Sequence, residues 1–216
     1  MSFSVFPKLL GEIDSPSDSP PYSPPYSSSF SRNTTTFFPG WNYDVSPSYS
    51  PPYSPSYSRN TTTFFPGWNY DVFLSFRGED TRRNFTDHLY KALVDKGTCT
   101  LRDKEGLERG EIIDQNLLQA IEKSRNFIII FSKNYANSES CLNELVKIME
   151  CRGRGRKALP IFYHVDPSEV EKQSGKYGEA FAVYENNANL EREQIQKWRT
   201  ALTKAGDRAG YHIENQ

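Results

Sequence analysis

The chain contains few cysteines, no excess of charge of either sign and no long apolar run. Its three cysteines, Cys99, Cys141 and Cys151, show no framework spacing, which argues against a disulfide scaffold and favours a reducing compartment. They form no CxxC pair and no Cys/His cluster, so we expect no metal site.

Other function classes are disfavoured by charge and hydropathy. The formal net charge is −1, whereas nucleic-acid binders carry a basic footprint. The longest apolar run, at 127–131, is far too short to span a bilayer. The first ten residues show no signal-peptide core. We therefore expect a cytoplasmic protein, with the nucleus as a second location, that contacts neither nucleic acid nor membrane.

Composition changes abruptly near residue 70. Twelve of the fourteen prolines lie before that point, while 23 of the 26 Lys and Arg residues and 23 of the 27 Asp and Glu residues follow it. The Ser/Pro/Tyr tracts favour solvated polyproline II and have nothing to bury. We interpret residues 1–66 as a mostly disordered tail and residues 67–216 as a folded domain.

The tail contains a tandem duplication of 27 residues, with copies at 19–45 and 46–72. Two copies are too few for a solenoid, which needs at least three stacked units. The second copy ends in Tyr70-Asp-Val72 and continues into an apolar segment, whereas the first returns to the Ser/Pro tract. Two interpretations stay open: a duplicated segment without function, or a tyrosine-rich docking tail.

From residue 69 onward, apolar β-rich runs alternate with helical patterns. We expect strands at 70–76, 98–101, 127–131, 158–163 and 210–213. Helical spacing is expected from Phe85 to Gly97, from Ile113 to Ile121, and at 141–149, 177–185 and 191–205. Such alternation predicts an α/β fold with a parallel sheet covered by helices on both faces. Ligands of such folds bind at the carboxyl ends of the strands.

Six segments occur in an order that identifies a family. They are Tyr70–Arg82 (YDVFLSFRGEDTR), Asn84–Leu89 (NFTDHL), Gly106–Gly110 (GLERG), Ser132–Ala136 (SKNYA), Cys141–Leu145 (CLNEL) and Leu159–Pro167 (LPIFYHVDP). Residues 69–213, about two thirds of the chain, resemble a plant-type Toll/interleukin-receptor (TIR) domain. The resemblance implies a flavodoxin-like sheet of five parallel strands.

The resemblance also implies an activity. TIR domains of plant resistance receptors signal by self-association, and many cleave NAD+ between nicotinamide and ribose. It thus predicts an NAD+ nucleosidase in plant immune signalling, active on self-association. NAD+ or NADP+ would be the substrate, no separate cofactor would be needed, and other TIR domains would be the partners in homo- or hetero-oligomers.

The resemblance places the catalytic carboxylate at Glu144. Cleavage of the N-glycosidic bond builds positive charge on the ribose, which a nearby carboxylate can stabilise. Because nicotinamide leaves from a cationic state, no general acid is required. From spacing alone, the alternative is that Glu144 near a helix start merely favours the helix dipole, worth about 0.3–1 kcal/mol.

The expected substrate contacts include Phe76, Arg77 and Gly78, which follow or end the first strand. A cation and a bare backbone there suit a diphosphate, but Arg77 could instead pair with Glu79 or Asp80 in a solvated turn. Ser138 could contact ribose or cap the following helix. The resemblance adds two positions to this set, Glu108 and Ser140.

Self-association is expected to involve the first helix of the domain and a loop at 102–110. The resemblance assigns this role to Asp87 and His88 on the helix and to Arg109 and Gly110 in the loop. A surface histidine and a solvated charged loop with turn glycines are the alternatives.

Three departures from the family pattern favour a second function. Ser140 stands where the family usually has Trp, so stacking worth about 1–3 kcal/mol would be lost. Leu101 replaces the usual Phe, and the final helix of relatives is missing from a chain that stops at Gln216. The alternative function is therefore a non-catalytic adaptor or decoy that binds other TIR domains.

Overall fold

A computed structural model describes residues 6–14, 67–102, 115–152 and 155–214. These residues all belong to one compact unit of the chain, formed by residues 1–18 together with residues 63–216. Residues 15–66, which hold the Ser/Pro/Tyr tracts and nearly all of the tandem duplication, lie outside the described residues.

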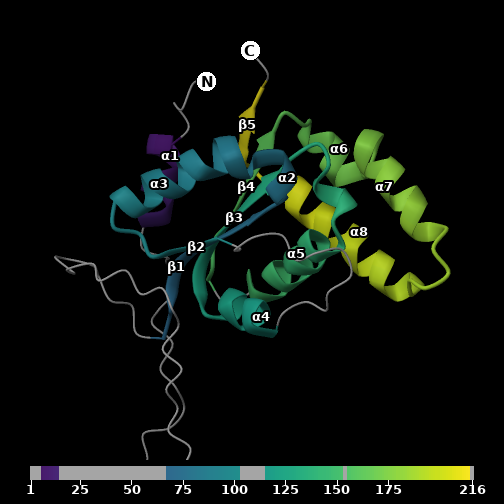
Figure 1. The fold of residues 1–216 in the computed structure, drawn as a ribbon, viewed down its shortest axis with the longest axis horizontal. Coiled ribbons are helices and arrows are strands. Elements are labelled where there is room, and N and C mark those ends of the chain that lie inside the picture. The colour runs from purple at the N-terminus through teal and green to yellow at the C-terminus, as the bar shows by residue number, and fades with distance from the viewer. Residues whose placement is uncertain (1–5, 15–66, 103–114, 153–154, 215–216) are drawn as a thin grey trace, which may run out of the picture. The chain divides into compact units, whose positions relative to one another are not determined.

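The unit is built around a parallel sheet of five strands in the order β2-β1-β3-β4-β5, as expected for a flavodoxin-like fold (Figure 1). The strands are β1 (Tyr70–Phe76), β2 (Thr100–Arg102), β3 (Ser124–Phe131), β4 (Ala158–Tyr163) and β5 (Tyr211–Ile213). Continuous apolar runs in β1, β3 and β4 fit strands that are buried on both faces.

One face of the sheet is covered by helices α3 (Asp87–Asp95) and α1 (Phe6–Asp14). A short helix, α2 (Gly78–Thr81), and a π-helical turn, η1 (Arg82–Thr86), lead from β1 into α3. Leu89 and Leu93, one turn apart on α3, are fully buried against this face.

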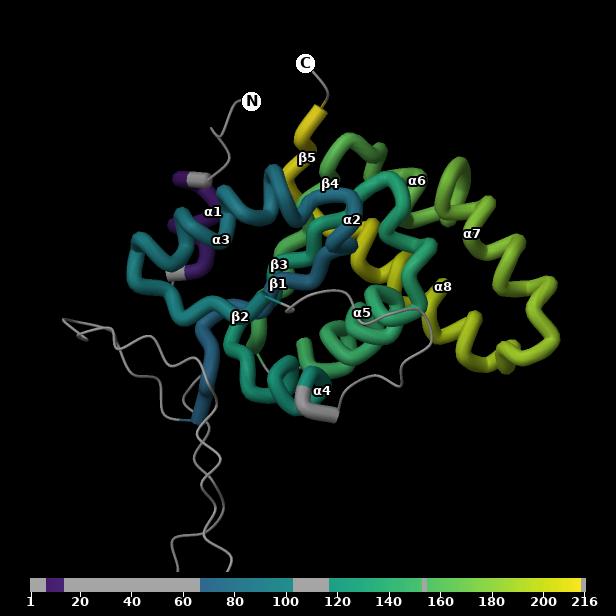
Figure 2. The backbone as a smooth tube through the Cα atoms, viewed as in Figure 1, coloured from purple at the N-terminus to yellow at the C-terminus, as the bar shows by residue number. Residues whose placement is uncertain are grey.

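The opposite face carries the larger core. Its helices are α4 (Gln115–Glu122), α5 (Glu139–Cys151), α6 (Pro167–Lys172), α7 (Gly175–Glu185) and α8 (Arg192–Gly206), with a 3-10 turn, η2 (Tyr135–Asn137), before α5. The backbone trace shows α8 running alongside α5 (Figure 2). Asn143 joins them, because its Oδ1 accepts hydrogen bonds of 2.7 Å from both Trp198 Nε1 and Gln194 Nε2.

Several predicted boundaries need correction. β3 begins at Ser124, not at 127. The first residues of this strand pair with β1 but are polar, so the apolar pattern did not include them in the predicted strand. Shortly after β4 ends, Asp166 and Pro167 begin a helix that was not predicted. The Asp166 side chain accepts a 2.7 Å hydrogen bond from the Ser168 backbone N–H, and Pro167 occupies the first turn of α6.

Helix α1 was not predicted either, since it lies in the segment interpreted as mostly disordered. It lies beside α3 on the same face of the sheet (Figure 1). The ordered structure therefore includes residues upstream of the predicted domain start. None of the described helices combines the length and the apolar character needed to cross a membrane.

Candidate functional site

The candidate site lies where β1 and β3 end side by side. The strand order places β1 between β2 and β3, so the chain leaves β1 toward one edge of the sheet and later continues toward the other. This reversal is the topological switch point at which doubly wound folds bind their ligands. Phe76 pairs with Ile130 near the ends of the two strands, so the loops that follow both strands meet here.

Helix α5 is fixed at this edge by its first turn. The Ser138 hydroxyl accepts a 3.3 Å hydrogen bond from the Cys141 backbone N–H and so caps the helix. The Cys141 thiol lies 3.5 Å from the Phe76 carbonyl oxygen and donates to it. Cys141 is buried, and its contact ties α5 to the end of β1.

The Glu144 carboxylate points from α5 toward β1 and is 3% exposed. Its Oε2 accepts a 2.9 Å hydrogen bond from the hydroxyl of Ser75 in the penultimate position of β1. Glu144 is therefore held against the end of β1 and is not a solvated side chain at the helix start.

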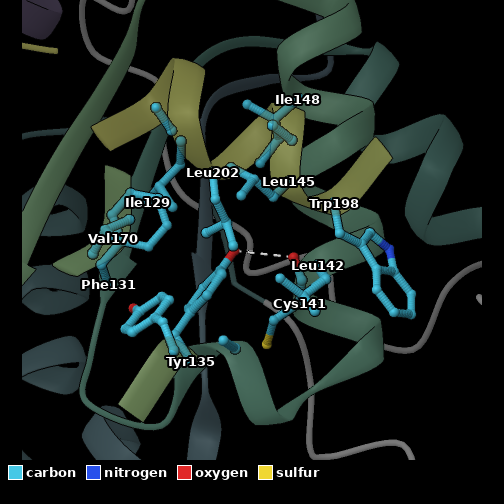
Figure 3. Packing of buried hydrophobic residues seen from close by; sticks show 14 of the residues in the cluster. Ile129, Phe131, Tyr135, Cys141, Leu142, Leu145, Ile148, Val170, Trp198 and Leu202 are labelled. Carbon is cyan, nitrogen blue, oxygen red and sulfur yellow. Dashed lines mark hydrogen bonds between the residues drawn. The ribbon is translucent and has the colours of Figure 1, made fainter. Parts of the chain in front are cut away.

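Tyr135 completes this buried network. Its hydroxyl donates a 3.0 Å hydrogen bond to the Cys141 carbonyl oxygen (Figure 3). The same hydroxyl lies 3.0 Å from Ser75 Oγ. Burial, with contributions from the charges that Cys141 and Glu144 can carry, raises the pKa of Tyr135 well above its ordinary value. The phenol therefore stays protonated. It can donate its one proton either to the Cys141 carbonyl oxygen or to Ser75 Oγ, both of which lie beside Glu144.

Asp80 links the loops that follow β1 and β3. Its carboxylate accepts hydrogen bonds from Ser132 Oγ at 2.6 Å, from Asn134 N at 3.1 Å and from Arg77 Nη1 at 2.7 Å. Burial acts to raise the pKa of Asp80, but the hydrogen bonds from Ser132, Asn134 and Arg77 outweigh it and lower that pKa. Asp80 is therefore an anchor that fixes the shape of this edge.

The predicted substrate contacts after β1 have partners within the protein. Arg77 pairs with both Glu79 and Asp80, which is the pairing alternative raised by the sequence. Phe76 is buried, and the Arg82 guanidinium lies over its ring, 5.1 Å from the ring centre. The place that a Cβ of Gly78 would take is 3.0 Å from that same guanidinium, so the glycine leaves room for it.

The remaining predicted residues lie either at the start of α5 or α3 or outside the described residues. Ser140 is partly exposed in the first turn of α5. Asp87 and His88 are exposed at the start of α3, and Asp87 forms an ion pair with Arg102 at the end of β2. Glu108, Arg109 and Gly110 lie outside the described residues.

Ser75 and Tyr135 were not predicted as parts of the site, and Asp80 was expected only as a possible partner of Arg77. Ser75 carried a usable signal, because a hydroxyl within an apolar strand needs a hydrogen-bond partner once buried. Tyr135 carried no such signal, since its contacts depend on the packing of η2 against α5. Within the described ranges, no group of three or more His, Cys, Asp or Glu side chains is arranged to hold a metal ion.

Comparisons with known proteins identify the family of this chain. The family model "TIR domain" matches residues 69–216. The disease resistance protein RPV1 of Vitis rotundifolia is 59% identical over 142 residues, which cover 65% of this chain and 10% of that relative. The TMV resistance protein N of Nicotiana glutinosa is 52% identical over 139 residues, covering 64% of this chain and 12% of that protein.

A solved structure is similar as well. The TIR domains of the activated Roq1 resistosome, which directly recognizes the pathogen effector XopQ, are 48% identical to this chain with a TM-score of 0.61. The match covers 66% of this chain and 87% of that one. By contrast, the chain spans about a tenth of the length of the curated resistance proteins that it matches.

Proposed function

The chain belongs to the TIR domain family, and from this membership we propose that it is an NAD+ nucleosidase of plant immune signalling. The reaction breaks the bond between nicotinamide and C1′ of the adjacent ribose. The bonding electron pair leaves with nicotinamide, and water adds to C1′ and releases a proton, giving ADP-ribose. NADP+ carries the same bond and is the second candidate substrate.

The observation that carries this proposal is the position of Glu144. Its carboxylate is held by a strand hydroxyl at the switch point of the sheet. As the bond to nicotinamide breaks, positive charge builds on the ribose, and an adjacent carboxylate stabilises it. In a buried setting this attraction is stronger than in water, because the local dielectric constant is lower.

Neighbouring groups supply positioning. Ser75 and Tyr135 fix the direction of the Glu144 side chain, and Asp80 holds the two loops that border it. Arg77, at 18% side-chain exposure, is the cation of this edge that could meet a diphosphate, and it would have to exchange its pairing with Glu79 to do so. We propose Phe76, Gly78, Glu108, Ser138 and Ser140 as further contacts to the substrate.

Self-association is part of the proposal. The similar Roq1 TIR domains come from an activated resistosome, which supports association of TIR domains as the active state of this chain. We propose that Asp87 and His88, which are exposed on α3, contact a partner domain, with Arg109 and Gly110 as the loop contribution. We place this activity in the cytoplasm, with the nucleus as the second location.

The test is nicotinamide release from NAD+ by the purified full chain over a range of protein concentrations. The proposal predicts equimolar nicotinamide and ADP-ribose-type product, with activity per molecule that rises with protein concentration. No release above the spontaneous rate at any concentration would contradict it.

A second candidate, a non-catalytic adaptor or decoy, is favoured by two observations. Glu144 is only 3% exposed, and Ser140 occupies the position where the family usually has Trp. The substitution Ser140→Trp distinguishes the two. If the chain is an enzyme with weak base stacking, the substitution restores about 1–3 kcal/mol of binding and lowers KM. An adaptor would show no turnover in either form.

A further inference from the structure

Helix α1 is a folded segment that lies outside the residues matched by the TIR family model. That match begins at residue 69, whereas α1 spans Phe6–Asp14. Its side chains Leu9, Leu10 and Ile13 are 0%, 5% and 2% exposed. Burial this complete is typical of core residues and not of a tail that touches a surface in passing.

These three side chains belong to one apolar cluster with the sheet face beside α3. The cluster includes Val72 and Leu74 of β1, Ile128 and Ile130 of β3, Ile161 of β4, and Leu89 and Leu93 of α3. The same strands direct their alternate residues into the opposite core, so α1 and α3 are the described helices that cover this face. The spacing of residues 9, 10 and 13 places all three side chains on one side of α1.

Polar contacts at Glu12 hold α1 in register with the sheet. Lys157 Nζ donates a 2.9 Å hydrogen bond to the Glu12 backbone carbonyl, and Tyr211 Oη donates a 2.6 Å hydrogen bond to Glu12 Oε1. Burial, followed by this hydrogen bond and the charge of Glu12, raises the pKa of Tyr211 to about 12, so the phenol is a donor at neutral pH. Lys157 lies just before β4, and Tyr211 is the first residue of β5. Glu12 therefore reaches the side of the apolar cluster that lies away from α3.

We propose that this face is a helix-binding groove and that α1 of the same chain is its ligand. The groove fits a short amphipathic helix that has apolar side chains on one side and a carboxylate among them. Leu9, Leu10 and Ile13 supply the apolar side chains, and Glu12 supplies the carboxylate. Helix α1 contributes no strand to the sheet, so its departure would leave the pairing of the five strands intact. Its departure would uncover part of the apolar cluster to which Leu9, Leu10 and Ile13 belong. This inference is independent of the proposed hydrolase activity.

The first test is hydrogen exchange on the full chain, read separately for residues 6–14. A bound α1 predicts slowed exchange of its backbone amides that is independent of protein concentration. Exchange of these amides at the unprotected rate would overturn the proposal. Protection that increases with protein concentration would assign the groove to α1 of a second copy and would overturn the assignment to the same chain.

The second test uses a labelled peptide of residues 1–18 and two full-length variants. Leu9→Asp with Ile13→Asp removes the apolar side of α1 and frees the groove, whereas Lys8→Asp changes an exposed residue of the same helix. We expect the peptide to bind the double variant and to bind the wild type and Lys8→Asp at least about tenfold more weakly, because their own α1 competes. Equal affinity for all three proteins would contradict an occupied groove. If the double variant fails to fold, the exchange measurement alone decides.

Discussion

The Ser75 hydroxyl donates a 2.9 Å hydrogen bond to Glu144 Oε2, joining residues 69 positions apart in the chain. This contact fixes an acidic side chain of α5 against the end of β1, at the point where the strand order reverses. Glu144 is thereby oriented by the core of the fold and not by a surface loop. Substitutions of residues around Ser75 and Glu144 distinguish a role in orienting the carboxylate from a role in stabilising the fold.

Ser75→Ala is expected to lower nicotinamide release about ten- to a hundredfold, because Glu144 loses the donor that orients it. The free energy of unfolding should also fall by about 1–3 kcal/mol, since a buried acceptor loses a partner. The matched control is Ser124→Ala. Ser124 is a fully buried strand serine at the opposite end of the sheet, where its hydroxyl donates to the Ala120 carbonyl. Equal loss of activity in both variants would show that stability alone is responsible.

Tyr135→Phe removes the hydroxyl that contacts Ser75 and the Cys141 carbonyl while keeping the ring in the core. We expect a loss of about 0.5–1.5 kcal/mol in unfolding free energy together with lower activity. Tyr184→Phe is the control, because the Tyr184 hydroxyl also donates to a buried carbonyl, that of Ala136, on the side of α7. We predict that the two variants have comparable thermal melts and that Tyr135→Phe releases nicotinamide more slowly than Tyr184→Phe. Unchanged activity in Tyr135→Phe would show that this residue does not belong to the site.

Asp80 gives a prediction about pH. Its pKa is lowered in the folded chain relative to the ordinary value of 3.8, so its contribution to stability is complete above pH 3.8 and is lost as the pH falls further, through the lower folded-state pKa. Asp80→Asn should therefore cost about 1.5–3 kcal/mol near neutral pH, and this difference should narrow in acid. Denaturant unfolding of wild type and variant across this range measures it.

The control for Asp80 is Asp95→Asn, at the exposed end of α3. Its unfolding free energy should follow that of the wild type at every pH. A difference between Asp80→Asn and wild type that stays constant down to pH values well below 3.8 would contradict the assigned ionisation.

His88 tests the self-association surface. His88→Ala on α3 should reduce the increase of activity with protein concentration, while leaving the thermal melt unchanged because the side chain is exposed. Lys204→Ala, exposed on α8 across the sheet, is the comparison. Analytical ultracentrifugation together with nicotinamide release reports both quantities. The same concentration dependence in both variants would place the contact elsewhere.

The strand pattern and the family motifs predicted the sheet well, because buried parallel strands are encoded by short continuous apolar runs. The prediction of 158–163 for β4 agrees with the structure. The start of β3 was missed since Ser124, Arg125 and Asn126 are polar, and their strand conformation depends on pairing with β1. Helix α1 was missed because its apolar side chains are few and their burial depends on a surface formed much later in the chain.

The family motifs pointed to Glu144 as the catalytic residue, and that role stays a prediction. Its contacts could not be predicted, because Ser75 and Tyr135 come from other elements and are brought together only by packing. Local sequence left Ser138 open between two roles, and the structure shows the cap. For Arg77 it shows pairing with Glu79 and Asp80, a geometry that local charge already indicated.

The central claim is that the Glu144 carboxylate acts on the ribose of NAD+. The most direct measurement is the rate of nicotinamide release by Glu144→Gln relative to wild type at equal concentration. Gln preserves the side-chain volume and an acceptor for Ser75 but removes the charge, and Glu150→Gln on the exposed end of α5 controls for charge loss. We predict a decrease of at least about a hundredfold for Glu144→Gln alone, with a wild-type fold. Equal rates for the two variants would contradict the account.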